Sequence, residues 1–151
     1  MWKNDLIEIR GIRKKRNREL NLGANRKEID FFYDAVQNIF GVIIPEEYKN
    51  FLETVNGIEF NGHILYGIDE SMSDNSPEQH IHGLIEMNQT WKENGFDAYL
   101  FIGEHDLSWF VYKESKGTFF ELDLPLGDEI VEFSSLDDLL DRFFKRALNR
   151  G

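Results

Sequence analysis

The chain has no cysteine and only three prolines among its 151 residues. The absence of cysteine excludes disulfide bonds, thiolate metal sites and a thiol nucleophile. No stretch approaches the roughly 18 consecutive apolar residues of a membrane span. The first residues, MWKNDLIEIRGIRKKRN, contain no apolar run long enough for a signal peptide. We therefore expect a protein of the reducing cytoplasm that neither crosses nor binds a membrane.

Glycine-rich nucleotide motifs are also missing. No G-x-G-x-x-G pattern opens a helix after a strand, and no P-loop is present. Together with the lack of thiolate ligands, this gives no reason to expect a cofactor. We predict none, and we predict no resident metal.

Charge is abundant and unevenly distributed. Residues 1–28 hold nine Lys/Arg and four Asp/Glu, a net charge of +5, whereas residues 29–151 hold eight and twenty-four, a net charge of −16. An acidic body repels nucleic acid and anionic membranes and attracts basic proteins at long range. Acidic charge also keeps many proteins soluble without any such partner.

Aromatic residues are plentiful, with thirteen Phe, five Tyr and three Trp, and they provide material for a core. The length is that of one ordinary domain. Apolar residues at helical spacing predict helices at about 2–20, 26–40 and 136–148, and a further helix at 80–94, where Gly83 interrupts the pattern. Pro45, Glu46 and Glu47 suit the start of a further short helix that ends at Asn56-Gly57.

The second helix shows two further local signals. Asn25 and Glu28 match a capping box at its start, and Gly41 is suited to close it. Its predicted buried stripe consists of Ile29, Phe32, Tyr33, Val36, Ile39 and Phe40.

Extended segments follow the short helix. Asn61-Gly62 joins two short runs, and Asn-Gly is a strong signal for a tight hairpin. Aromatic and β-branched residues predict strands at 99–104, 107–113, 118–124 and 129–133. The chain is thus predicted to be an α+β fold, with an antiparallel β-sheet on which N-terminal helices and a C-terminal helix pack.

Candidate catalytic groups are few. Glu104, His105, Asp106 and Ser108 are close in sequence, but neighbours in sequence rarely converge as a triad does. His80 and His82 are two residues apart, with no third metal ligand specified by spacing. A hydrolytic or metal-dependent enzyme that uses these residues is an alternative, and we expect a protein that is not an enzyme.

One segment resembles a known family. The run EIDFFYDAVQNIFGVIIPEEYKNFLETVNGIEF is similar to the SUKH superfamily of Knr/Smi-type domains, in which a (L/I)P-x-x-Y-x-x-F-L helix ends in N-G. The matching residues are Glu28, Ile29, Ile44, Pro45, Tyr48, Phe51, Leu52, Asn56 and Gly57. Ile58 and Glu59 replace the tryptophan or extra glycine that relatives often carry there. We predict a single SUKH-like domain over residues 1–151, with the basic first helix, about 2–20, included, although such a helix is not a feature of the family pattern.

The same resemblance implies a protein-binding function. Many bacterial members look like immunity proteins that neutralise a cognate toxin, often a nuclease, while fungal relatives are linked to control of cell-wall synthesis through protein partners. An acidic immunity protein for a basic toxin domain is the favoured hypothesis, and a regulatory scaffold is the alternative. The candidate partner-binding residues are acids in predicted loops or beside them: Asp69, Glu70, Asp74, Glu104, Asp106, Asp128 and Glu129.

Overall fold

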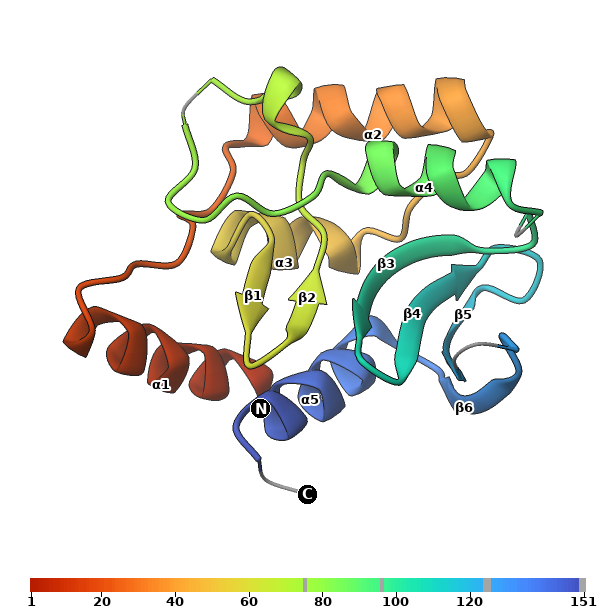
Figure 1. Ribbon diagram of the computed structural model, residues 1–151. Coiled ribbons are helices and arrows are strands. Elements are labelled where there is room, and N and C mark those ends of the chain that lie inside the picture. The colour runs from red at the N-terminus through yellow and green to blue at the C-terminus, as the bar shows by residue number, and fades with distance from the viewer. Residues whose placement is uncertain (75, 96, 124–125, 150–151) are drawn as a thin grey trace.

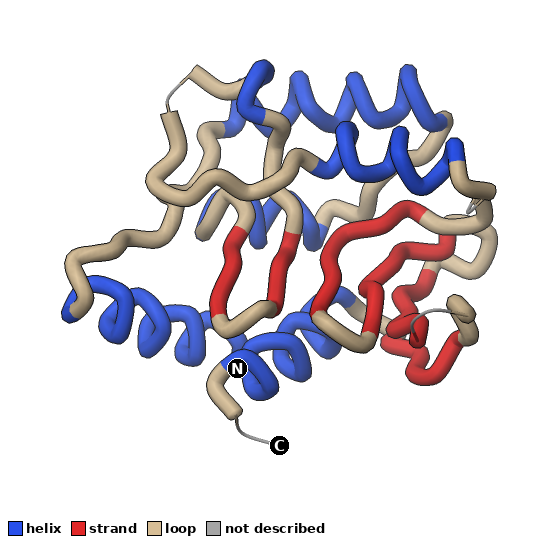
Figure 2. The backbone as a smooth tube through the Cα atoms, in the orientation of Figure 1, coloured by secondary structure: helices blue, strands red, loops and turns tan. Residues whose placement is uncertain are grey.

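The computed structural model describes residues 1–74, 76–95, 97–123 and 126–149 (Figures 1 and 2). Its helices are α1 (Trp2–Lys15), α2 (Arg26–Phe40), α3 (Glu47–Thr54), the 3₁₀ helix η1 (Glu70–Met72), α4 (Leu84–Glu93) and α5 (Leu136–Ala147). Its strands are β1 (Ile58–Phe60), β2 (His63–Leu65), β3 (Leu100–His105), β4 (Ser108–Lys113), β5 (Thr118–Asp123) and β6 (Glu129–Phe133). The strands form one antiparallel sheet in sequence order, which confirms the α+β class.

The helices lie on two sides of the molecule. Figure 1 shows α2 and α4 along the top and α1 and α5 along the bottom, with the strands between them. On the lower side, the rings of Trp2 in α1 and Phe144 in α5 are stacked with centroids 5.9 Å apart. Phe51 of α3 lies 6.3 Å from Trp2, so three helices contribute to the same aromatic packing.

Local sequence signals place helices α2 and α5 where they were predicted. Asn25 and Glu28 form the capping box, and Gly41 closes α2 with a φ of 71°. The side chain of Ser135 accepts a hydrogen bond from the backbone N–H of Asp138 and so caps α5. Such caps satisfy backbone groups that a helix terminus leaves unpaired.

The predicted hairpin is also confirmed. Asn61 and Gly62 have φ values of 51° and 77°, as a tight turn between β1 and β2 requires. Strand β4 is buried along nearly its whole length, which explains why its sequence is apolar on both faces. The third predicted aromatic strand is β5, whose described part ends at Asp123; Leu124 and Pro125 lie outside the described residues.

Three helix boundaries differ from the prediction. Helix α1 ends at Lys15, because Arg16 and Asn17 turn the chain and Leu20 then enters the core. Helix α3 ends at Thr54, because Val55 is extended and fully buried. Gly57 has a φ of 81° and belongs to the turn into β1.

Helix α4 begins at Leu84, four residues later than predicted. Both carboxylate oxygens of Asp69 accept backbone N–H bonds at its start, from Ile85 and Glu86, each at 3.0 Å. A Cβ at Gly83 would lie 2.2 Å from the Asp69 carboxylate, so glycine permits this close approach. The helix start is therefore set by a residue distant in sequence.

Side-chain burial on α2 confirms the predicted stripe in part. Ile29, Phe32 and Val36 are buried and Tyr33 and Phe40 are half-buried, but Ile39 is 50% exposed. Phe31, outside the predicted stripe, is 62% exposed.

Within the described part of the chain, no helix combines the length and the hydrophobicity needed to cross a membrane.

Candidate functional site

The seven acids proposed to bind a partner occupy three separate places. Asp69, Glu70 and Asp74 lie in or beside η1, on the side of the molecule that carries α2 and α4 (Figure 1). Glu104 and Asp106 are at the β3–β4 turn, and Asp128 and Glu129 are at the start of β6. Asp69 and Glu70 of the first group line an open groove.

Asp69 has a structural role. Its carboxylate caps α4, as described above, and is partly buried. Burial raises its pKa, while the N–H groups of Glu86 and Ile85 oppose that shift. Its negative charge faces the groove, but its oxygens are occupied by the helix.

Glu70 and Asp74 are exposed. Glu70 Oε1 lies 2.8 Å from His80 Nδ1, and this pair is at the surface. The backbone N–H of Asp74 donates to Glu28 Oε2 at 2.9 Å, and the Ser73 hydroxyl donates to the same oxygen at 2.8 Å. The side chains of Glu70 and Asp74 therefore project from a loop whose backbone is anchored.

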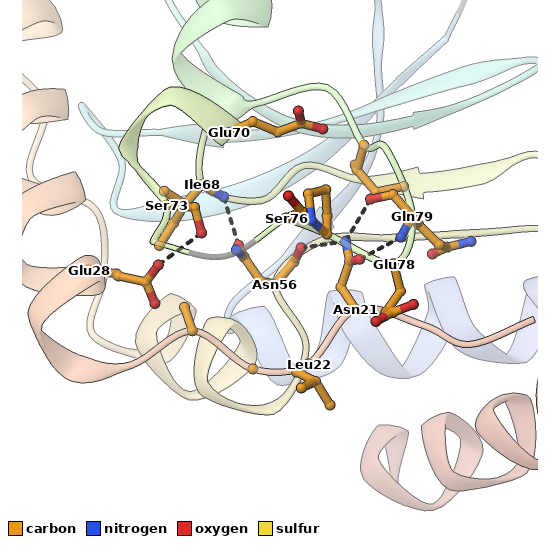
Figure 3. Close-up of a pocket in the computed structure, with 14 residues that line it drawn as sticks. Asn21, Leu22, Glu28, Asn56, Ile68, Glu70, Ser73, Ser76, Glu78 and Gln79 are labelled. Atoms are coloured by element: carbon orange, nitrogen blue, oxygen red, sulfur yellow. Dashed lines mark hydrogen bonds between the residues drawn. The ribbon is translucent and has the colours of Figure 1, made fainter.

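The anchoring of this loop is visible in Figure 3, which shows a cleft of about 250 Å³. The Asn21 amide binds the backbone of Gln79 in both directions, through Oδ1 at 2.7 Å and Nδ2 at 3.1 Å. Asn56 Oδ1 accepts the N–H of Ile68 at 2.8 Å. Burial alone would raise the pKa of Glu28, but its three hydrogen bonds lower it. The polar groups of this cleft thus hold the loop in place.

A second, larger hollow of about 600 Å³ lies between α2, η1, residues 80–83 and α4; we call it the α2–α4 groove. Its acidic residues are Asp69, Glu70 and Glu86, and its apolar residues include Ile39 and Ile85. Its described lining residues are Ala35, Ile39, Asp69, Glu70, Ser71, Met72, His80, Ile81, His82, Gly83, Ile85, Glu86 and Gln89. That lining contains neither lysine nor arginine.

Phe31 does not line the groove but lies on the same side of α2 as the lining residues Ala35 and Ile39. It precedes Ala35 by four residues and Ile39 by eight, so the three lie along one side of α2. Phe31 and Ile39 are 62% and 50% exposed. An exposed aromatic side chain next to a groove with an acidic border is typical of a protein-binding surface.

The remaining candidate acids are partly engaged within the chain. Glu104 accepts a hydrogen bond from the Tyr66 hydroxyl at 2.6 Å. Glu129 accepts bonds from Lys113 at 3.0 Å and Tyr99 at 2.8 Å, which lower its pKa. Asp106 and Asp128 are exposed. These four acids lie at the β3–β4 turn and at the start of β6, on other elements than the acids of η1.

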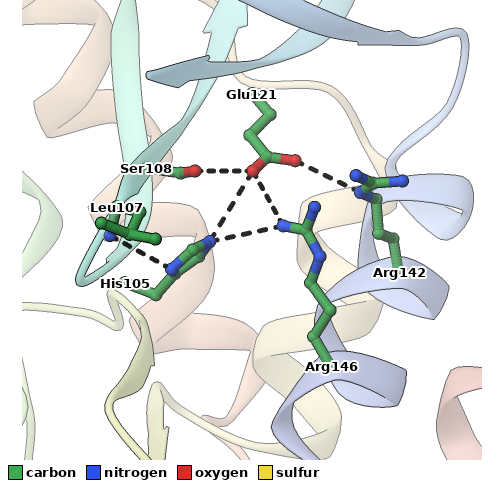
Figure 4. Close-up of polar contacts among 6 residues, drawn as sticks. All are labelled: His105, Leu107, Ser108, Glu121, Arg142 and Arg146. Atoms are coloured by element: carbon green, nitrogen blue, oxygen red, sulfur yellow. Dashed lines mark hydrogen bonds and ion pairs between the residues drawn. The ribbon is translucent and has the colours of Figure 1, made fainter. Parts of the chain in front are cut away.

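The four sequence neighbours considered as a catalytic set do not form one site. Two of them, His105 and Ser108, come together at Glu121 of β5, which is 1% exposed (Figure 4). Ser108 Oγ donates to Glu121 Oε2 at 2.6 Å, and His105 Nε2 lies 3.7 Å from that oxygen. Glu104 bonds elsewhere, and Asp106 is exposed.

Two arginines of α5 complete this Glu121 cluster. Arg146 Nη1 donates to Oε2 at 2.8 Å, and Arg142 Nε donates to Oε1 at 3.2 Å. Burial alone would raise the pKa of Glu121, but the hydrogen bonds from Arg146 and Ser108 and the charges of both arginines lower it. Burial and the neighbouring His63 ring, 4.9 Å away, lower the pKa of His105. The cluster joins α5 to the sheet as a satisfied ion network.

The two histidines considered as metal ligands are also separated in role. His80 pairs with Glu70, and His82 is exposed along the groove. In the part of the chain that the structure describes, no group of three His, Asp or Glu residues is arranged to hold a metal ion.

Sequence reasoning missed two kinds of residue. Glu121 lies in an aromatic strand, and its only signal is Arg142 and Arg146, four residues apart on one face of a helix. Phe31 was not singled out, although it lies between Asp30 and Asp34 and falls off the buried stripe of α2. Its position off the stripe was the available signal.

Comparison with known proteins gives the family. No curated protein sequence matches the chain. The model of the SMI1-KNR4 cell-wall family, SUKH_6, matches residues 34–123, more than half of the chain. The match includes the Pro45–Gly57 motif and all of the elements from α3 to β5. The chain therefore belongs to the SMI1-KNR4 family of the SUKH superfamily.

Proposed function

We propose that this protein is an immunity protein that binds a toxin polypeptide and blocks its activity. The observation that carries the proposal is the α2–α4 groove, where exposed acids border apolar side chains and no lining residue carries a lysine or arginine charge. Domains of this family generally act as binding or immunity proteins, and the net charge of −16 over residues 29–151 fits a basic partner.

Electrostatics gives a physical reason for this pairing. A toxin that acts on nucleic acid presents a basic surface, and an acidic protein competes for that surface. Long-range attraction raises the association rate well above that of neutral partners, and salt reduces the gain. Apolar contacts in the groove then slow dissociation, which neutralisation requires.

A regulatory scaffold for cell-wall synthesis is the second candidate. It is supported by the description of the family as SMI1-KNR4 cell-wall proteins. Such a scaffold would bind a protein of its own cell and would have no toxin gene beside it.

Co-expression with toxin domains encoded next to this gene tests the proposal. The expected result is restored growth of cells that make the toxin, together with co-purification of the two proteins. A chain with Phe51→Ala, which removes a core side chain, serves as the destabilised control. Failure of the wild-type chain to restore growth or to co-purify with any neighbouring toxin would contradict the proposal, and a stable complex with an endogenous cell-wall protein would favour the scaffold.

A further inference from the structure

We propose that the α2–α4 groove is the docking surface, and that its occupant is a basic segment of the partner that inserts one apolar side chain. This inference rests on the proposed function for the identity of the partner as a toxin. The groove itself specifies the chemistry of the segment, since its lining combines apolar side chains with acids.

The apolar requirement comes from Phe31 and Ile39. Both are largely exposed, lie on one side of α2 and continue into half-buried Ala35 and buried Ile85 across the groove. Exposing them costs free energy that a partner would recover by covering them. A hollow of about 600 Å³ has room for a large aliphatic or aromatic side chain.

The basic requirement comes from the border. Glu70 and Glu86 are exposed and line the groove, one in η1 and one in α4. Asp74 lies on the anchored loop beside η1 and adds a third exposed carboxylate. Among the described residues, no lysine or arginine is ion-paired with any of the three, and Glu70 pairs with His80. Lys or Arg residues on both sides of the inserted side chain would pair with these acids.

The walls of the groove are fixed before binding. Asp69 holds the start of α4, Asn88 joins α4 to the backbone of Phe101, and Glu28 holds the loop at Ser73. A preformed groove loses little conformational freedom on binding, which favours high affinity.

A matched pair of variants tests the apolar part. Ile39 is 50% exposed in the groove, and Ile130 is 52% exposed on β6, outside it. With the toxin domain that co-purifies, Ile39→Asp and Phe31→Ala should each weaken binding about 30-fold, while Ile130→Asp leaves the Kd unchanged. Equal losses for Ile39→Asp and Ile130→Asp, or a loss only for Ile130→Asp, would overturn the groove while leaving the immunity function intact.

A second measurement does not depend on the toxin. The ¹⁵N-labelled protein is titrated with a synthetic helical peptide of leucine and lysine, and amide shifts are mapped. We expect shifts at Phe31, Ala35, Ile39 and Ile85, and their loss in the Glu70→Lys/Glu86→Lys variant. Shifts confined to the β3–β4 turn or β6, or no binding at millimolar peptide, would overturn the groove proposal even if a toxin is neutralised.

The alternative occupant of the groove is a second copy of this chain. Its helix α1 exposes the basic residues Lys3, Lys14 and Lys15, which could pair with the groove acids. Sedimentation velocity of the protein alone distinguishes it. A monomer across the micromolar range agrees with the proposal. A dimer that dissociates in the Glu70→Lys/Glu86→Lys variant would assign the groove to self-association and overturn it.

Discussion

The two sides of the molecule use the same residue types in opposite ways. On the α1–α5 side, Phe51 and Phe144 are fully buried and the carboxylate of Glu121 is bound by two arginines. On the α2–α4 side, Phe31 is 62% exposed and the groove carboxylates have no described lysine or arginine partner. Phe51, Phe144 and Glu121 are committed to folding, whereas Phe31, Glu70 and Glu86 are exposed and remain available for binding.

This difference separates stability from recognition. Removing a side chain whose contacts are all internal changes the free energy of unfolding, because a cavity or an unpaired charge remains. Removing an exposed side chain changes little in the free protein and much in a complex. The following variants compare the two sides directly.

The largest effect is expected for the aromatic pair. Phe51→Ala should lower the free energy of unfolding by about 3–5 kcal/mol, because Phe51 is fully buried against Trp2 and Tyr48. Phe31→Ala should change it by less than about 0.5 kcal/mol. Urea denaturation followed by circular dichroism measures both. A loss near zero for Phe51→Ala would mean that α3 does not pack as described.

The second comparison concerns carboxylates. Glu121→Gln should destabilise the protein by about 2–3 kcal/mol, because Arg146 and Arg142 lose a charged, buried partner. The control is Glu129→Gln, whose partner Lys113 is at the surface, with an expected loss of about 0–1 kcal/mol. The urea midpoints of the two variants at pH 7 measure both losses. Equal losses would show that the buried Glu121 cluster contributes no more to stability than the surface pair of Glu129 and Lys113.

Stability on the α1–α5 side should also depend on pH in two steps. The pKa of His105 is lowered from its ordinary 6.5, so the unfolded chain takes up that proton first and stability falls as pH drops below about 6.5. The pKa of Glu121 is lowered from 4.5, so its contribution is complete above about pH 4.5 and is lost as pH falls further. Thermal unfolding from pH 8 to 3 should lose the upper step in His105→Asn and the lower step in Glu121→Gln. Unchanged profiles in both variants would exclude these groups as the cause.

Much of the fold could be predicted from the sequence because its signals are local. The capping box at Asn25, the Asn61-Gly62 turn and the apolar stripe of α5 each act within a few residues. The start of α4 could not be predicted, because Asp69, fifteen residues upstream of Leu84, sets it through tertiary contact. The helix propensity of Gly83 gave no indication of the contact between Asp69 and the start of α4.

Binding of a partner by the seven loop acids stays a prediction. Of these acids, Glu70 and Asp74 are exposed, and Glu70 lines the groove. Asp69 looked the same in sequence but caps a helix, and Glu104 is bonded to Tyr66. Single acidic residues carry no information on their partners, since those come from distant elements. The exposure of Phe31 agrees with its position off the apolar stripe, whereas the exposure of Ile39, a stripe residue, depends on tertiary packing that periodicity does not specify.

The smallest effect on stability is expected at the groove acids. Glu70→Gln with Glu86→Gln should change the free energy of unfolding by less than about 0.5 kcal/mol, because both side chains are exposed and Glu86 contributes only a modest interaction with the start of α4. The same double variant should associate with the toxin domain about tenfold more slowly at low salt, and the difference should shrink at high salt, since screening weakens long-range attraction. Stopped-flow association at two ionic strengths measures this, with Asp106→Asn/Asp128→Asn as the matched control on the other acidic loops. If the groove variant instead unfolded as easily as Glu121→Gln, its acids would belong to the folding network, and the division between the two sides of the molecule would not hold.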